Sequence, residues 1–384
     1  MKILTADIGT GTQDIFLYDS KLDIENGFKL ILPSPTMRMY HRIKEATHKG
    51  ESIALTGKIM GGGPSAWAVE AHLKAGLKVY STPQPARTID DDLEKVEEIG
   101  VVLISEDEAK ELPESVTRID LKDFDFEEIR QVFTRYGVSL DDLEAVSLAV
   151  FDHGDAPPDI SDRQFRFDYL DERIKERNDL RSFAFLSDEI PESMTRLQAA
   201  AESCMSANTP VVVMDTAPAA ILGATFDHKV EERINNLIAN IGNFHTLAFR
   251  LNSGKIDGVF EHHTGLLNME DLETLLVSLA QSTLKHEDVF NHHGHGALIY
   301  NAEPYPLDSG EFNLVITGPR RKMMNGISTS STLRPYFAVP FGDMMIAGCF
   351  GLLAATADRI PELSEPILKS LSNRTGSDIA PWDI

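Results

Sequence analysis

The chain has 384 residues, 42% hydrophobic and 25% charged, a composition typical of a globular protein with room for two domains. Its formal net charge of −24 excludes a nucleic-acid or anionic-membrane surface, because phosphate backbones and lipid headgroups carry charge of the same sign. The sequence contains no apolar run of membrane-spanning length and no signal-peptide pattern, so we expect a cytoplasmic protein.

The first predicted element is a β-hairpin with apolar strands over residues 2–7 and 14–19. Its turn is rich in glycine and hydroxyl residues and contains Gly9, Thr10, Gly11, Thr12 and Gln13. Glycines let backbone N–H groups approach an anion, and Asp7 at the strand end is placed to hold a hydrated Mg²⁺. We interpret this turn as a phosphate cradle, with a plain structural turn as the alternative.

A second glycine-rich segment follows the strand predicted over residues 52–57. It runs from Lys58 through Gly62 and opens a predicted helix over 66–76, so that an anion or substrate could sit at the helix N-terminus. No Gly-Lys-Ser/Thr sequence follows, which excludes the Walker phosphate loop. The alternative is a tight structural turn.

Residues from about 87 to 208 are more acidic and less regular, and we interpret them as an insertion in the first lobe. Within this segment, the strand predicted over 145–151 runs into Asp152, His153 and Asp155. Two acids and a histidine beyond a strand end can bind a metal ion or act as acid and base. A turn capped by its own aspartates is favoured over both.

A second segment repeats the strand–glycine turn–strand order of the first hairpin. An apolar strand over 210–215 ends in Asp215 and is followed by a run of small residues over 216–224. Next come a strand ending in Asn240, a turn with Gly242 and Asn243, and a strand containing Thr246. This repetition predicts an internal duplication.

Two groups of histidines follow this unit. His262 and His263 lie at the end of a predicted strand that faces the cleft expected between the two halves of the chain. There they are candidates to contact substrate, phosphate or metal. The run from His292 to His295 is typical of a zinc-binding tract. Because it lies between a helix and the following strand, we expect it on a surface loop facing away from the cleft.

The C-terminal part contains two further elements. A buried strand over 312–317 leads into Gly318 and Arg321. Residues 342–355 form an uncharged helical pattern with small residues spaced for close crossing, apart from Asp343. The segment is too short and too rich in glycine for a membrane span, so we predict a buried hinge helix.

The order of these parts resembles the superfamily of actin, heat-shock chaperone ATPases, and acetate and sugar kinases. Its two phosphate motifs are similar to residues 4–18 and 240–246, its connecting helices to 215–224 and 343–355, and its adenosine motif to 317–321. The resemblance implies an α/β fold of two actin-like (ribonuclease H-like) lobes around a nucleotide cleft, with the connecting helices as hinge and ATP and Mg²⁺ as cofactors.

The same resemblance implies roles for single residues. Asp7 holds Mg²⁺ through water, the two glycine turns clasp the phosphates from opposite lobes, and Asp215 orients metal-bound water. Gly318 passes close to the nucleotide and Arg321 stacks on adenine. The chain departs from the superfamily at Asn240, where an aspartate is usual, and at the turn residues Asn243 and Phe244, which replace glycines.

The sequence also resembles a family labelled as pyruvate formate-lyase activating enzymes. Such activases cleave S-adenosylmethionine with an iron–sulfur cluster held by three closely spaced cysteines, whereas this chain has only Cys204 and Cys349. The label is therefore not interpreted as the chemistry of this chain.

These patterns divide the chain into a first lobe over 1–224, a second over 225–341 and a hinge helix with C-terminal segment over 342–384. The leading hypothesis is an ATP- and Mg²⁺-dependent phosphotransferase or ATPase with a small-molecule or protein acceptor. The alternatives are a partner-activating or scaffold protein that uses nucleotide as a switch or not at all, and a metal-dependent hydrolase. The acceptor and the formation of a homodimer stay open.

Overall fold

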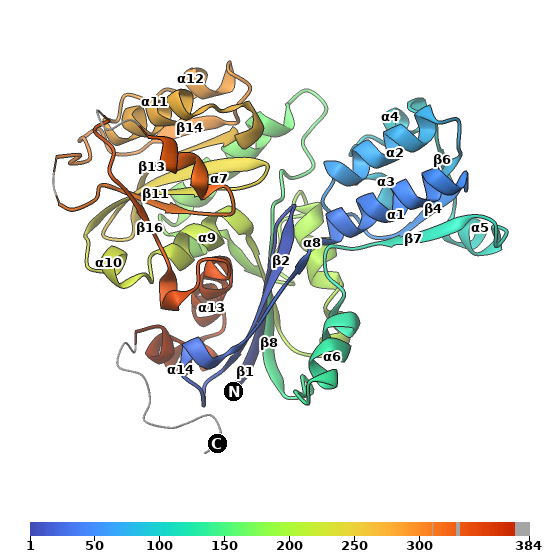
Figure 1. Ribbon diagram of the computed structural model, residues 1–384, viewed down its shortest axis with the longest axis horizontal. Helices are drawn as coiled ribbons and strands as arrows, with labels where there is room; N and C mark the ends of the chain where they lie inside the picture. The colour runs from blue at the N-terminus through green and yellow to red at the C-terminus, as the bar shows by residue number, and fades with distance from the viewer. Residues whose placement is uncertain (309, 328–330, 373–384) are drawn as a thin grey trace.

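A computed structural model describes residues 1–308, 310–327 and 331–372 of the chain. The described residues form two six-stranded sheets and one four-stranded sheet. Figure 1 shows two lobes, each built on one of the large sheets, with helices α9 and α13 between them and the small sheet projecting to one side.

The first sheet has the strand order β3-β2-β1-β8-β10-β9. Its strands are β1 (Lys2–Ile8), β2 (Thr12–Asp19), β3 (Phe28–Pro33), β8 (Leu143–Val150), β9 (Ala184–Leu186) and β10 (Val211–Asp215). The second sheet has the order β14-β13-β12-β11-β15-β16. Its strands are β11 (Asn235–Ile241), β12 (His245–Asn252), β13 (Lys255–His263), β14 (Gly296–Ile299), β15 (Leu314–Thr317) and β16 (Pro335–Phe337).

The third sheet has the order β6-β5-β4-β7 and is entirely parallel. Its strands are β4 (Ile53–Gly57), β5 (Val79–Ser81), β6 (Val101–Leu103) and β7 (Thr117–Leu121). The helices that accompany it are α1 (Pro35–Lys49), α2 (Pro64–Lys74), α3 (Pro83–Ala86), α4 (Leu93–Glu98) and α5 (Glu106–Glu111).

The remaining helices cover the two large sheets and connect the lobes. In the first lobe these are α6 (Phe126–Arg135), α7 (Asp162–Glu176) and α8 (Thr195–Glu202), and in the second lobe α10 (His228–Glu231), α11 (Met269–Ala280) and α12 (His286–Phe290). The connecting and C-terminal helices are α9 (Thr216–Ala224), α13 (Ala347–Arg359) and α14 (Pro361–Ser372).

The two large sheets share one topology. In each, an antiparallel meander of three strands is followed by two parallel strands, in the order β3-β2-β1-β8-β10 and β13-β12-β11-β15-β16. The hairpins β1–β2 and β11–β12 have the same lengths, the same register of seven pairs and the same sequence of buried and exposed positions. The predicted actin-like fold of two ribonuclease H-like lobes is confirmed.

The inserted sheet does not coincide with the insertion predicted over about 87–208. Its strands lie within residues 53–121, and the chain then returns to the first sheet, where β8 pairs in parallel with both β1 and β10. The difference arises because short apolar strands look alike whether they join the central sheet or form one of their own.

Helices α9 and α13 cross closely at the centre of the molecule, and α13 also packs against β1. A Cβ atom at Gly223 of α9 would overlap the carbonyl of Ala347, and one at Gly351 of α13 would overlap the carbonyl of Ala219. Small residues therefore set the distance between the two helices that connect the lobes. The small residues predicted to allow a close crossing thus lie where the two helices meet.

Replacing Gly223 by alanine is expected to destabilise the protein by about 1–3 kcal/mol, because the added methyl group has to push apart two backbones in a filled core. Urea denaturation measures the change in the free energy of unfolding. Gly265→Ala is the matched control, since no atom lies within 4 Å of a Cβ at that position. Equal stability of the two variants would contradict close packing at this crossing.

The described part of the C-terminal segment packs on the first lobe: Ile367 and Leu371 of α14 are buried with Ile3 and Phe16. Residues 373–384 of that predicted segment lie outside the described residues.

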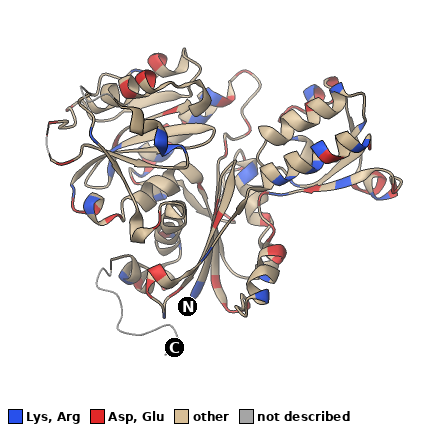
Figure 2. Cartoon of the chain, viewed as in Figure 1, with Lys and Arg blue, Asp and Glu red and all other residues tan. Residues whose placement is uncertain are grey.

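Charged residues occur mainly on helices and loops, while the central strands are mostly uncharged (Figure 2). No helix within the described ranges combines the length and apolarity needed to cross a membrane.

Candidate functional site

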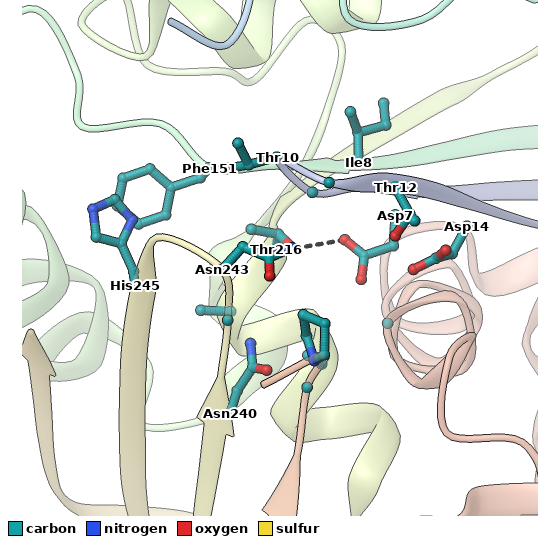
Figure 3. Close-up of a pocket in the computed structure, with 18 of the residues that line it drawn as sticks. Asp7, Ile8, Thr10, Thr12, Asp14, Phe151, Thr216, Asn240, Asn243 and His245 are labelled. Carbon is teal, nitrogen blue, oxygen red and sulfur yellow. Dashed lines mark hydrogen bonds between the residues drawn. The ribbon is translucent and has the colours of Figure 1, made fainter. Parts of the chain in front are cut away.

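The two hairpin turns meet across a pocket between the lobes (Figure 3). Of the residues predicted to bind nucleotide, those that line this pocket are Asp7, Gly9, Thr10, Gly11, Thr12, Asn240, Gly242, Asn243 and Gly318. Its free volume of about 120 Å³ is below the ~300–1,000 Å³ typical of small-molecule sites. A nucleotide-sized ligand therefore does not fit unless the residues that line the pocket move.

The turns have the same backbone geometry. The N–H of Gly9 donates to the carbonyl of Thr12 at 2.9 Å, and the N–H of Gly242 donates to the carbonyl of His245 at 2.9 Å. The side chain of Asn243 lies against Gly11, where a Cβ atom would come within 2.6 Å of its amide nitrogen. The side chain of Asn243 thus fills space between the two turns.

Two carboxylates face each other across the first hairpin. Asp7 and Asp14 are directly paired in the register of β1 and β2, and both line the pocket. Burial and the charge of Asp7 raise the pKa of Asp14 to about 8, and one of its carboxylate oxygens, Oδ1, has no hydrogen-bond partner in the structure. The pair is an acidic site open to a cation.

Asp7 has one clear hydrogen-bond partner. The hydroxyl of Thr216, at the start of α9, donates to its Oδ1 at 2.5 Å (Figure 3). Burial raises the pKa of Asp7 to about 6, against the effect of this hydrogen bond, and the nearby charge of Asp215 raises it further. The sequence reasoning missed Asp14 and Thr216, although Asp14 could have been found from its position opposite Asp7 in a two-strand hairpin.

Four of the other predicted nucleotide-site residues do not line the pocket. Gln13 is buried and donates to the carbonyl of Pro33, and the Thr246 hydroxyl pairs with that of Thr264. The guanidinium of Arg321 lies 5.8 Å from the ring centroid of Phe337. These three side chains contact the protein itself in this conformation.

The fourth, Asp215, caps α9 by accepting from the N–H of Ala217 and forms an ion pair with Arg166 at 2.6 Å. It is 1% exposed. The first turn of α9 therefore offers Thr216 to the pocket, while the predicted carboxylate points into the core.

Arg166 is the centre of a buried network that joins the lobes. From α7 of the first lobe it binds Asp215 and, at 2.7 Å, Glu261 of β13 in the second lobe, and its guanidinium lies 4.0 Å from the ring centroid of Phe151. Arg166 and Glu261 are fully buried. Burial raises the pKa of Glu261 to about 7, although the Arg166 charge lowers it. This network could not be predicted from the sequence, because its members are far apart in the chain.

A groove beside the pocket brings together four of the predicted substrate residues: Gly62, Asp152, His153 and Asp155. Lys58, His262 and His263 do not line it, and Lys58 pairs with Glu202. Arg196 lines both the pocket and the groove, and Asp123 holds its guanidinium through two hydrogen bonds of 2.6 and 2.9 Å. A fixed positive charge therefore lies at the junction of the two spaces.

The groove is rich in acids, and their mutual repulsion is expected to show in the pH dependence of stability. Burial, and then the charges of Asp155, Asp162 and Asp152, raise the pKa of Asp91 to about 7. A folded-state pKa above the unfolded value means that this carboxyl favours the folded state increasingly as pH falls from about 7 towards 4. Asp91→Asn should therefore raise the melting temperature at pH 8 by a few degrees and flatten its rise on acidification.

Thermal unfolding between pH 5 and 8 measures this effect. Asp107→Asn, which changes a carboxyl that is 90% exposed, is the matched control and should leave the profile unchanged. If the melting temperature of Asp91→Asn changes with pH as that of the unmodified protein does, the repulsion between Asp91 and its acidic neighbours is contradicted.

A cluster of histidines lies at the lobe junction. His153, His245 and His295 place ring nitrogens within 4.8 Å of one another. His263 is adjacent, with ring centroids 5.0 Å from His245 and 4.7 Å from His295. Burial lowers the pKa of His245 and His295 well below the usual range, so both imidazoles are neutral at pH 7.

The prediction that the run from His292 to His295 faces away from the cleft is wrong for its last member. His292 and His293 are exposed, but His295 is fully buried, and its N–H donates to the carbonyl of Glu261 at 2.9 Å. The run ends at β14, which pairs antiparallel with β13 rather than in parallel, so that its first residue lies at the cleft end. His262 is buried and contacts the carbonyl of His292 at 2.9 Å.

The family model described as "Putative pyruvate format-lyase activating enzyme (DUF1786)" matches residues 60–323. A comparison with curated proteins found no match.

Three solved structures that are similar to this chain have low TM-scores. The ethanolamine utilization protein EutJ from Carboxydothermus hydrogenoformans has a TM-score of 0.33 at 8% identity, over 92% of this chain and 89% of its own. MreB5 of Spiroplasma citri bound to ADP has a TM-score of 0.33 at 11% identity, over 91% and 94%. A ROK family transcriptional regulator, a homolog of the E. coli MLC protein, has a TM-score of 0.26 at 11% identity, over 66% of this chain and 37% of its own.

Proposed function

This chain belongs to the family described as "Putative pyruvate format-lyase activating enzyme (DUF1786)", and we propose that it is a Mg²⁺-dependent nucleotide-binding protein that acts as a phosphotransferase or ATPase. The observation that supports the proposal is the meeting of two equivalent glycine turns across one pocket, with Asp7 and Asp14 on one side. Glycine turns facing each other suit a polyphosphate, and a pair of carboxylates suits its divalent cation.

The residues present fit a hydrated Mg²⁺ better than the cluster that the family description implies. Two facing carboxylates with raised pKa values, one with an unpaired buried oxygen, gain from a cation between them. Iron–sulfur clusters are bound by cysteine thiolates, but Cys204 and Cys349 are buried in different hydrophobic clusters and the sequence has no third cysteine. No radical step is derived for this chain.

The chain's own groups have defined tasks in this proposal. Asp7, fixed by Thr216, and Asp14 position the cation, which neutralises phosphate charge when bound. The hydroxyls of Thr10 and Thr12 donate to phosphate oxygens from the first lobe. Arg196 at the junction with the groove stabilises charge where a phosphoryl group would pass to an acceptor.

The second lobe supports an alternative in which nucleotide acts as a switch and is not turned over. At the positions that match Asp7 and Asp14 in the equivalent hairpin stand Asn240 and Leu247, and these two side chains carry no charge to hold a metal ion. Hydrolysis measured as phosphate release distinguishes the two: a nucleotide that binds without release supports the switch.

Isothermal titration of the full chain with ATP and ADP, with Mg²⁺ and with EDTA, tests the proposal. We expect binding that is stronger with Mg²⁺. The absence of heat and of a thermal shift at millimolar nucleotide would overturn it.

A further inference from the structure

We propose that His153, His245 and His295 bind one divalent transition-metal ion at the junction of the lobes, separate from the Mg²⁺ position beside Asp7. Their ring nitrogens already lie within 4.8 Å of one another. Metal–imidazole bonds of ~2.0–2.1 Å in a tetrahedral site separate the ligand nitrogens by about 3.3 Å. Each imidazole therefore needs to move by less than about 1 Å.

The three ligands come from separate elements of both lobes. His153 follows β8 of the first lobe, His245 is the first residue of β12, and His295 immediately precedes β14. The backbone N–H of His295 is anchored to Glu261, and Phe151 stacks on the His245 ring at 4.1 Å between centroids. The site is thus formed only when the lobes lie together.

The strongest sign of a missing ligand is a set of buried polar atoms without partners. Both ring nitrogens of His295, which is fully buried, and Oε1 of buried Glu261 have no hydrogen bond. Buried polar atoms are normally paired, because leaving one unpaired costs about 1–3 kcal/mol. A metal ion bound to one ring nitrogen of His295 would satisfy that atom. A small shift of the other ring nitrogen towards Glu261 would pair it with Oε1.

Glu261 is placed as the carboxylate that orients metal-binding imidazoles. Its Oε1 lies 3.7 Å from Nδ1 of His295 and 4.0 Å from Nδ1 of His245, which leaves the Nε2 atoms of both rings for the metal. Metal-binding histidines usually donate their other N–H to such a group. The opposite oxygen of Glu261 binds Arg166, which fixes the carboxylate.

The surroundings of the three histidines suggest which ligand would occupy the fourth coordination position of the ion. Three neutral imidazoles leave a fourth position of a tetrahedral ion open, as in catalytic sites. His153 is exposed and lines the groove, while His245 lines the pocket. An oxygen ligand from a molecule in the groove, such as a carboxylate or phosphate, would reach the ion. Binding of the ion itself does not depend on the proposed nucleotide function.

Metal binding is tested on the full chain, stripped with EDTA, dialysed, and titrated with Co²⁺, whose visible absorption reports tetrahedral nitrogen ligation. We expect about one equivalent bound, and the same in an Asp7→Asn background. His153→Ala should weaken binding by more than about 100-fold while leaving circular dichroism unchanged, because the side chain is exposed. Free imidazole should restore part of the absorption in that variant.

His292→Ala is the matched control, since this exposed residue lies in the histidine-rich run but outside the cluster. It should bind Co²⁺ within about twofold of the unmodified protein. The proposal is overturned by less than about a tenth of an equivalent in the unmodified protein, by equal affinity in His153→Ala, or by a loss in His292→Ala or Asp7→Asn as large as that in His153→Ala.

Discussion

Asp7→Asn is expected to weaken Mg²⁺-dependent nucleotide binding by about 100-fold or more and to abolish any phosphate release. The substitution keeps the shape of the side chain and an oxygen that accepts from Thr216, but removes one of the two carboxyl groups that face the pocket. In EDTA, Asp7→Asn should bind nucleotide as tightly as the unmodified protein or more tightly. A carboxylate repels phosphates when no cation lies between them. Titration calorimetry in both conditions measures this difference.

The same variant should be at least as stable as the unmodified protein at pH 8. Since burial raises the pKa of Asp7 to about 6, its ionised form disfavours the folded state above that pH. A loss of binding without a loss of stability therefore separates a functional role from a structural one. Asp107→Asn on the remote helix α5 is the matched control, and Mg²⁺-nucleotide affinity unchanged in Asp7→Asn would contradict the proposed function.

Arg166→Met is expected to produce the largest loss of stability, about 3–5 kcal/mol. The substitution leaves Asp215 and Glu261 as buried carboxylates without a counter-charge, and removing one partner of a buried ion pair is far more costly than replacing the whole set. A triple variant that also carries Asp215→Asn and Glu261→Gln should therefore recover much of the loss. Urea denaturation of both proteins measures the free energy of unfolding.

Arg38→Met provides the control for this experiment, because Arg38 pairs with Glu128 at the surface, where both side chains are more than 40% exposed. Its cost should be below about 1 kcal/mol. If Arg166→Met costs no more than Arg38→Met, the buried network does not carry stability.

Local patterns allowed the two hairpins to be predicted from the sequence. A continuous apolar run, an acid or amide one residue before the strand end, and a glycine two residues after that acid or amide recur in both halves, and the topology of the lobes follows from repeating that unit. The division of the first lobe was harder, because nothing in residues 53–57 distinguishes a strand of an inserted sheet from a strand of the main one.

The histidine cluster and the Arg166 network could not be predicted in the same way. Their members come from both lobes, and each residue has an ordinary local context: His245 opens a strand, and Glu261 lies two residues before the end of one. Their contacts depend on how β13 pairs with β14 within the second sheet and on how that sheet meets the first lobe, which are both set by tertiary packing. The place of Asp215 at the end of a strand follows from the sequence pattern. The direction of its side chain depends on the ion pair with Arg166 of the distant helix α7.

The contact of α2 with the second lobe has a practical consequence. Trp67 projects from the inserted sheet's helix and lies 5.6 Å, between ring centroids, from Phe244 in the second turn. Its side chain is largely exposed, so little else holds it there. Any opening between the lobes would exchange the aromatic neighbour of this indole for water, and its fluorescence would follow that motion without an added dye.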